Sequence, residues 1–194
     1  MKTIKPNYKK YFNHLAYEGS FIGRIYRELI LYPRLNHYLK GQTLDLGCGI
    51  GHIIAFRKST VGCDINPYNI SFCKKKKLEA YLMKPDKLPF KNQSFESVFM
   101  DNVLEHIASP NKLIGEITRV LKPGGILLIG VPGVKGFKRD DDHKIFYNES
   151  NLADLAKQHN FRVNHFFYMP FVKSEFLNHH LSQYCIYTQW SKVR

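Results

Sequence analysis

The stretch Thr43-Leu-Asp-Leu-Gly-Cys-Gly-Ile-Gly51 decides the fold of this chain. Its first four residues are typical of a short buried strand. Three glycines then alternate at Gly47, Gly49 and Gly51, directly before an apolar helical run. Glycines between a strand and a helix leave the main chain bare, so a ligand can approach it closely. The stretch therefore predicts a ligand-binding turn, with a tight turn that binds nothing as the alternative.

The next apolar segment, 60–65, is predicted to be the second strand, and Asp64 stands near its end. In a doubly wound sheet, an acidic side chain at this point holds a ribose diol. A dinucleotide and S-adenosylmethionine both fit this description. The dinucleotide fingerprint has glycine at positions one, three and six of the loop. Here position six is His52 and the third glycine is at position five, which argues against a pyrophosphate ligand.

Strand and helix patterns alternate along most of the chain. Strands are predicted at 43–47, 60–65, 79–83, 95–101 and 125–131, and helical segments at 51–57, 67–77, 103–107 (a short turn), 110–121 and 149–159. This rhythm predicts an α/β fold with a doubly wound, mostly parallel sheet. Segments 161–169 and 183–190 follow as strands with no helical pattern between them, so we expect them to pair antiparallel at one edge. A length of 194 residues suits one domain, 1–194.

Residues 1–40 precede the first strand as an N-terminal arm and helix. The segment Tyr8–Tyr17 is rich in aromatic residues, and 23–39 has a helical pattern with apolar residues on one face. The arm either packs against the core or folds over the ligand cleft as a lid, since aromatic side chains with polar tips suit a pocket mouth.

Composition narrows the class of protein. The chain is 44% hydrophobic and carries a net charge of +13, which can attract nucleic acid, anionic lipid or an acidic small molecule. The densest basic cluster, Lys74 to Lys77, falls at the end of a predicted helix, where a solvated helix end is the plainer interpretation. No apolar run reaches the length of a membrane span. The four cysteines form no CxxC pair, so we expect reduced thiols, a cytoplasmic protein and no metal site.

The second half carries further local signatures. They are Leu88-Pro-Phe90, the segment Leu104-Glu-His-Ile107, and Arg119-Val-Leu-Lys-Pro-Gly-Gly125. Taken in order with the glycine-rich stretch and Val61-Gly-Cys-Asp64, these motifs are specific. The chain resembles the class I S-adenosylmethionine-dependent methyltransferases, and within them the small-molecule branch that includes methylases of quinone biosynthesis. The resemblance implies a Rossmann-like seven-stranded sheet whose last two strands form an antiparallel hairpin.

The resemblance also implies a site for S-adenosyl-L-methionine, which leaves as S-adenosyl-L-homocysteine. Asp64 would accept hydrogen bonds from the ribose hydroxyls, and Asp45 would help to place the methionine amino group. The implied cofactor-binding residues are Asp45, Gly47, Cys48, Gly49, Asp64, Ile65, Asp86, Leu88, Asp101 and Asn102. The chain departs from the family at Lys84, where an acidic residue often receives the adenine amino group, so backbone atoms or Asp86 must substitute.

Methyl transfer to a hydroxyl needs a group that takes the proton, and histidine suits this near neutral pH. His106 follows the fourth predicted strand, and His143 lies in the loop between 132 and 147. Both are candidate catalytic residues. The alternatives are a structural histidine for His106 and a solvated loop residue for His143. The aspartates at 140–142 are too weak a signal for a metal site.

The sequence therefore predicts a methyltransferase that acts on a small or carrier-linked (lipid- or glycan-linked) acceptor at a hydroxyl. Weak association with a membrane surface is compatible with the charge, and the oligomeric state stays open. An RNA methyltransferase is the alternative that the charge favours. Against specific nucleic-acid binding, the segment Asp101-Asn-Val-Leu104 lacks the Asn/Asp-Pro-Pro-aromatic motif of base-amino methylases. A non-catalytic cofactor-binding protein is the third hypothesis.

Overall fold

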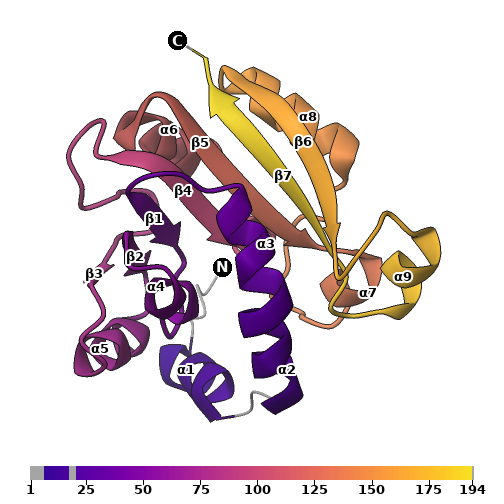
Figure 1. The fold of residues 1–194 in the computed structure, drawn as a ribbon, viewed down its shortest axis with the longest axis horizontal. Helices are drawn as coiled ribbons and strands as arrows, with labels where there is room; N and C mark the ends of the chain where they lie inside the picture. The colour runs from indigo at the N-terminus through magenta and orange to yellow at the C-terminus, as the bar shows by residue number, and fades with distance from the viewer. Residues whose placement is uncertain (1–6, 18–20, 194) are drawn as a thin grey trace, which may run out of the picture.

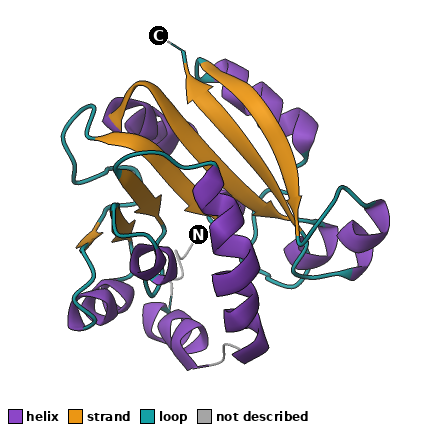
Figure 2. Ribbon diagram, in the orientation of Figure 1, coloured by secondary structure: helices purple, strands orange, loops and turns teal. Residues whose placement is uncertain are grey.

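The computed structural model describes residues 7–17 and 21–193, which form one sheet with helices on both faces (Figures 1 and 2). The strands are β1 (Thr43–Leu46), β2 (Thr60–Asp64), β3 (Ala80–Leu82), β4 (Phe95–Asp101), β5 (Leu121–Pro132), β6 (Phe161–Met169) and β7 (Cys185–Lys192). They lie in the order β3-β2-β1-β4-β5-β7-β6. Neighbours from β3 to β5 run parallel, and β7 runs antiparallel to both β5 and β6. The predicted seven-stranded, mostly parallel sheet with an antiparallel C-terminal hairpin is confirmed.

The central strands are buried along their length, as parallel strands covered on both faces must be. Every residue of β1 and β2 is buried. Leu44 pairs with Val61 on one side and with Val98 on the other. This register brings the carboxyl ends of β1, β2 and β4 to one edge of the sheet, which we call the site edge.

Helices cover both faces. They are α1 (Tyr8–Tyr17), α2 (Phe21–Tyr26), the π-helical turn η1 (Arg27–Leu31), α3 (Tyr32–His37), α4 (His52–Phe56), α5 (Pro67–Lys75), the 3-10 turn η2 (Leu104–His106), α6 (Asn111–Val120), α7 (Val134–Phe137), α8 (Glu149–Gln158) and α9 (Glu175–His180). On one face, α6 and α8 bury side chains such as Ile117 and Leu152 in the larger core cluster. On the other, Leu35 of α3 packs with Phe99 and Tyr187. In Figure 1, α3 crosses in front of the sheet.

The structure differs from the prediction in three places. The strand expected at 125–131 begins at Leu121, because Leu121 already pairs with Phe95 and the Lys-Pro-Gly-Gly turn forms an irregularity within the strand. The short helices α7 and α9 were not predicted, since each is too short to show a helical period. The helix expected at 23–39 contains a π-helical turn and includes α2, η1 and α3.

The apolar face of that helix is only partly used. Leu31 and Leu35 are buried against the sheet, whereas Ile22 and Leu29 stay largely exposed. In Figure 1, α2 extends past the ends of the strands, so its apolar residues have no sheet beneath them. Residues 1–6 and 18–20 of the predicted arm lie outside the described residues. Among the helices that the structure describes, none is both long and apolar enough to span a membrane.

Candidate active site

The conformation of the loop after β1 requires glycine at three positions. Gly47, Gly49 and Gly51 all have positive φ, at 77°, 52° and 79°, a region that side chains with a Cβ rarely adopt. A Cβ at Gly47 would clash with Val103, and one at Gly49 would point at Leu15 of α1, 3.4 Å away. Both positions are predicted to let a ligand approach the bare main chain. In the structure Val103 lies against Gly47, and Leu15 of α1 lies over Gly49.

Asp64 connects this loop to the start of α5. Its Oδ2 accepts a hydrogen bond from the Gly49 amide at 2.9 Å and another from the Asn69 side chain at 3.0 Å. Its Oδ1 accepts one from the Asn66 amide at 2.7 Å. A carboxylate offers about four acceptor positions, so some capacity remains. These bonds fix the direction of the Asp64 side chain at the site edge.

Two further carboxylates share this edge. Asp45 is almost fully buried, and within the described part of the chain no hydrogen-bond donor reaches its side chain. Burial, and then the charges of Asp101 and Asp64, raise its pKa well above the ordinary value. Asp101 accepts a hydrogen bond from the Tyr187 hydroxyl at 2.9 Å, yet burial raises its pKa to about 6. The site edge is therefore a region of poorly compensated negative charge.

The other predicted cofactor residues divide into two groups. Cys48 and Leu88 are buried in the core, and the Leu88 amide donates to Glu116 at 2.9 Å. Ile65 and Asp86 are exposed, as a residue that meets a ligand can be. Asn102 is also exposed, and its positive φ of 51° turns the chain sharply at the end of β4.

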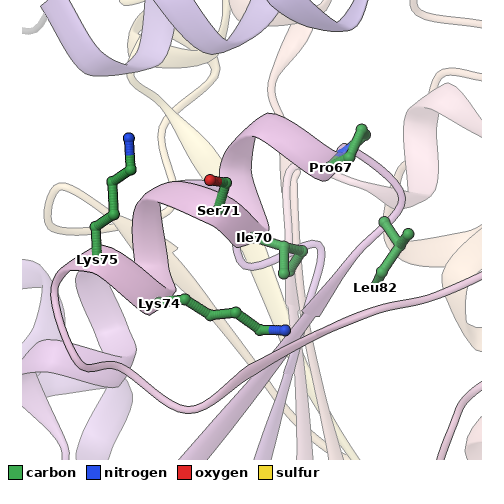
Figure 3. Close-up of a pocket in the computed structure, with 6 residues that line it drawn as sticks. All are labelled: Pro67, Ile70, Ser71, Lys74, Lys75 and Leu82. Atoms are coloured by element: carbon green, nitrogen blue, oxygen red, sulfur yellow. The ribbon is translucent and has the colours of Figure 1, made fainter.

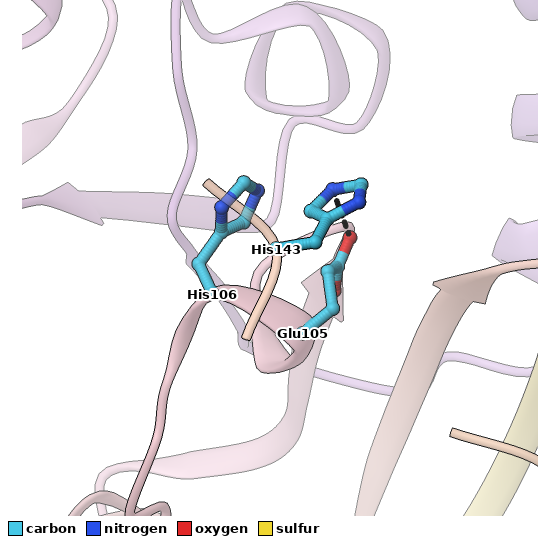
Figure 4. A group of neighbouring side chains, drawn as sticks. All are labelled: Glu105, His106 and His143. Atoms are coloured by element: carbon cyan, nitrogen blue, oxygen red, sulfur yellow. Dashed lines mark ion pairs between the residues drawn. The ribbon is translucent and has the colours of Figure 1, made fainter. Parts of the chain in front are cut away.

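The two predicted histidines lie together, beside a third residue that sequence reasoning missed. The His106 and His143 rings are 4.6 Å apart, and His143 Nε2 is 3.7 Å from Oε1 of Glu105. Figure 4 shows the three side chains converging, with the ion pair dashed. The Glu105 side chain is fully buried, and burial raises its pKa to about 8. A signal for Glu105 was present, since it stands between Leu104 and the candidate His106 in the turn after β4.

His143 does not point into solvent. Its side chain is only 8% exposed, its ring stacks on Phe137, and Nδ1 is 2.8 Å from the Phe137 carbonyl oxygen. His106 Nδ1 is 3.4 Å from Oδ2 of Asp142. The interpretation of His143 as a solvated loop residue is therefore wrong, while its catalytic role stays a prediction.

Helix α1 lies beside the glycine loop. The Asn66 side chain donates to the Tyr8 carbonyl at 2.9 Å, and the Phe12 ring packs on Tyr68 and Phe72 of α5. Burial, and then the charges of Asp64 and other acidic groups of the site, raise the pKa of Tyr11 to about 12. The arm is thus close to the carboxylates of the site edge.

A hollow of about 550 Å³ lies elsewhere, between α5 and β3 (Figure 3). It is lined by Pro67, Ile70, Ser71, Lys74, Lys75 and Leu82. None of the predicted cofactor or catalytic residues lines it. We therefore do not assign it to the candidate active site.

Known proteins resemble this chain in sequence and in fold. An uncharacterized protein of Methanocaldococcus jannaschii is 34% identical over 62% of this chain and 62% of its own length. A tRNA (carboxymethyluridine(34)-5-O)-methyltransferase of Arabidopsis thaliana is 29% identical over 65% of this chain and 34% of its own length. The chain thus spans about three fifths of the first relative and one third of the second. A crystal structure of a possible histamine N-methyltransferase of Thermotoga maritima has a TM-score of 0.74 at 18% identity, covering 95% of this chain and 99% of that one.

A family model for a methyltransferase domain matches residues 44–129, which include the glycine loop and all three site-edge aspartates. S-adenosylmethionine carries a positive sulfonium and a positive ammonium group. Asp45, buried without a hydrogen-bond donor in the described part of the chain, and its neighbours Asp64 and Asp101 supply the negative potential that suits those charges. The site thus fits the cofactor of the matched family, S-adenosylmethionine. Residues 44–129 are therefore a methyltransferase domain, and the chain has the fold of S-adenosylmethionine-dependent methyltransferases.

Proposed function

We propose that the protein transfers a methyl group from S-adenosylmethionine to a hydroxyl oxygen of a small or carrier-linked acceptor. The observation that carries the proposal is the group Glu105, His106 and His143. Glu105 and His106 lie in the turn after β4, and His143 reaches them from the loop after β5. Acceptors bind on this side of the sheet in open α/β folds. Methylation of a hydroxyl benefits most from such a group, because the hydroxyl must lose its proton.

Methyl transfer requires few other groups from the protein. A lone pair of the acceptor oxygen forms the new bond to the methyl carbon. The methyl–sulfur bond breaks with its electron pair going to sulfur, and the hydroxyl proton leaves. In-line positioning can supply much of the rate enhancement, about 7–11 kcal/mol in favourable cases. We assign His143 and His106 the task of favouring loss of the proton, and Asp45 and Asp64 the task of holding the cofactor.

We also propose that two segments cover the site together. One is the arm Tyr8–Tyr17, supported by the contacts of α1 with α5 and by the position of Leu15 over Gly49. The other is the loop 132–147, which leaves β5 at its carboxyl end and carries His143. Both segments should become more protected from hydrogen exchange when cofactor and acceptor are bound, because closure excludes water.

The test is turnover of labelled S-adenosylmethionine against a panel of hydroxyl-bearing acceptors. With an acceptor in hand, His143→Ala should lower turnover by about 10²-fold or more and leave S-adenosylhomocysteine affinity nearly unchanged. His179→Ala is the matched control, since His179 is an exposed histidine of α9 that pairs only loosely with Glu175. Cofactor binding without turnover on any acceptor would favour a non-catalytic, cofactor-binding protein.

Methylation of tRNA is the second candidate function. It is favoured by the tRNA methyltransferase among the relatives and by the net charge of +13. Binding driven by charge alone should be weak, independent of sequence and steeply dependent on salt. Tight binding of one RNA at physiological salt, with methyl transfer to it, would replace the small acceptor by RNA.

We propose that the protein works in the cytoplasm. The proposal is supported by Cys48, Cys63, Cys73 and Cys185, which are all free thiols. Weak association with anionic membrane surfaces is compatible with the basic charge. Sedimentation with anionic vesicles at low salt, lost at physiological salt, would identify it as purely electrostatic.

A further inference from the structure

The Glu105 carboxylate is an unusual group. It is fully buried, and neither of its oxygens has a hydrogen-bond partner within the described part of the chain. An unpaired buried carboxylate is costly, and proteins almost always compensate one with donors, an ion pair or a metal ion. Its main-chain oxygen, in contrast, accepts bonds from the Lys144 and Ile145 amides at 2.7 and 3.1 Å. These bonds tie the turn after β4 to the loop that carries His143.

His143 is held so that its free nitrogen faces this carboxylate. The Phe137 carbonyl, 2.8 Å from Nδ1, can only accept, so Nδ1 carries the hydrogen and donates it. Nε2 then faces Oε1 of Glu105 at 3.7 Å, which is too long for a hydrogen bond. With its hydrogen on Nδ1, a neutral His143 points the Nε2 lone pair at the carboxylate, an arrangement that a metal ion or a proton between them would compensate.

His106 completes the group from the same turn. Its Nδ1 lies 3.4 Å from Oδ2 of Asp142, which leaves the other ring nitrogen for a second partner. One ligand atom from each of Glu105, His106 and His143 can be chosen so that all three lie within 4.8 Å of one another. The side chains approach one another from two segments, the turn after β4 and the loop after β5 (Figure 4).

We propose that Glu105, His106 and His143 bind one divalent transition-metal ion. Two imidazoles and one carboxylate form a ligand set that suits Zn²⁺ and similar ions and leaves coordination positions open. Bond lengths near 2.0–2.2 Å require the three side chains to draw together slightly from their present separation. The Phe137 carbonyl and the Asp142 carboxylate then act as the outer partners that orient metal-bound histidines.

This inference deepens the proposed function and rests on it only for the role of the ion. An open coordination position would hold the acceptor oxygen and favour loss of its proton, which leaves to water. His143 and His106 then act by holding the ion. A proton on Glu105 or on His143 is the competing way to compensate the buried carboxylate, and the experiment separates the two.

The experiment measures metal binding without turnover. The full chain is treated with a chelator, dialysed, and titrated with Zn²⁺ by calorimetry, and Co²⁺ is added in parallel to record its visible absorption. We expect one ion per chain and a Co²⁺ spectrum of bound nitrogen and oxygen ligands. Glu105→Gln and His143→Ala should each weaken Zn²⁺ binding by about 100-fold or more, above the about 10–100-fold typical of outer partners.

Matched controls separate this site from surface histidines. His179→Ala removes an exposed histidine near an acidic residue, and Asp141→Asn removes an exposed carboxylate of the same loop. Both should bind Zn²⁺ as the unmodified chain does. His106→Ala, at a partly exposed position, serves as a third ligand variant that should fold, and S-adenosylhomocysteine binding reports folding in every variant.

The outcomes distinguish the two proposals. Absence of stoichiometric Zn²⁺, or equal affinity in Glu105→Gln and His179→Ala, overturns the metal site and leaves the methyl transfer to hydroxyl acceptors standing if turnover persists. One bound ion that depends on Glu105 and His143, with no hydroxyl acceptor methylated, supports the metal site and contradicts the proposed function.

Discussion

The two edges of the parallel sheet hold their polar groups in opposite ways. At the edge opposite the site, the Arg57 guanidinium donates to the Gly41 and Ser59 carbonyls and to Thr43. Arg119 donates to the Leu88 and Phe90 carbonyls and to Glu116. At the site edge, Asp64 accepts three hydrogen bonds, but within the described residues no donor reaches the side chains of Asp45 and Glu105. The pKa values of Asp45, Asp101 and Glu105 are raised.

The difference separates residues that stabilise the fold from residues kept for ligands. Charges that are fully bonded within the protein close loops and have nothing left for a ligand. Carboxylates buried without partners lower the stability of the ligand-free chain, and their interaction with a bound cation restores it. Removing a fully bonded charge at the opposite edge should therefore lower stability, whereas neutralising a poorly compensated carboxylate at the site edge should raise it.

The largest effect should come from Arg119→Ala, at the opposite edge. The change removes a two-bond contact with Glu116 and the donors to two carbonyls of the loop before β4. Hydrogen bonds from charged groups are each worth about 1.5–3 kcal/mol, and partial exposure of Arg119 reduces their sum. We expect the free energy of unfolding to fall by about 3 kcal/mol in urea titration. A loss below about 0.5 kcal/mol, the range of ordinary surface substitutions, would contradict the assigned role.

The second effect is on binding. Asp64→Ala should weaken S-adenosylhomocysteine binding by about 2 kcal/mol, near 30-fold, as loss of a charge-assisted pair of hydrogen bonds would. Calorimetry measures the affinity. Asp64→Asn is the matched variant, because it keeps nearly the size of the side chain and one oxygen that can accept the internal hydrogen bonds. Unchanged affinity in both variants would refute the ribose assignment. NAD should not bind measurably to the unmodified chain.

The glycine turn could be predicted from sequence because its determinants are local. Gly47 and Gly49 adopt positive φ where the turn was expected, and Asp64 at the end of the second strand accepts a hydrogen bond from the Gly49 amide. The cofactor roles of these residues stay predictions. The acceptor side is different. Glu105 and His143 are 38 positions apart, and the bonds from the Lys144 and Ile145 amides to the Glu105 carbonyl help to hold them together. No local pattern records that long-range contact.

The third prediction tests whether a poorly compensated carboxylate at the site edge lowers the free energy of unfolding of the ligand-free chain. The pKa of Asp101 is raised to about 6 from 3.8. Between those values the unfolded chain loses its proton first, so the contribution of Asp101 to stability falls as pH rises from about 4 to about 6 and then stays constant. Asp101→Asn should therefore raise the free energy of unfolding at pH 7. We expect a gain of about 1–2 kcal/mol, less than the full linkage value because the charge-assisted bond from Tyr187 is weakened.

Two measurements check this result. Urea unfolding of both proteins at pH 7 and at pH 4 should show the difference shrinking toward zero at the lower pH, where Asp101 is largely protonated in the native state. S-adenosylhomocysteine affinity should fall in the same variant. A variant that is destabilised at pH 7 would mean that the Asp101 carboxylate is better compensated than its burial indicates.

The smallest effect is expected at a helical glycine that lies away from the site edge and that no proposed function requires. Gly115 lies inside α6, is exposed, and has open space where a Cβ would be added. Glycine in a helix costs about 0.5–1 kcal/mol relative to alanine, so Gly115→Ala should raise the free energy of unfolding by that amount in urea titration. S-adenosylhomocysteine affinity should not change. Gly47→Ala is the paired variant, because the positive φ and the clash with Val103 should make the same substitution destabilising there. Similar changes in both variants would mean that the glycine loop is not held in its left-handed turn.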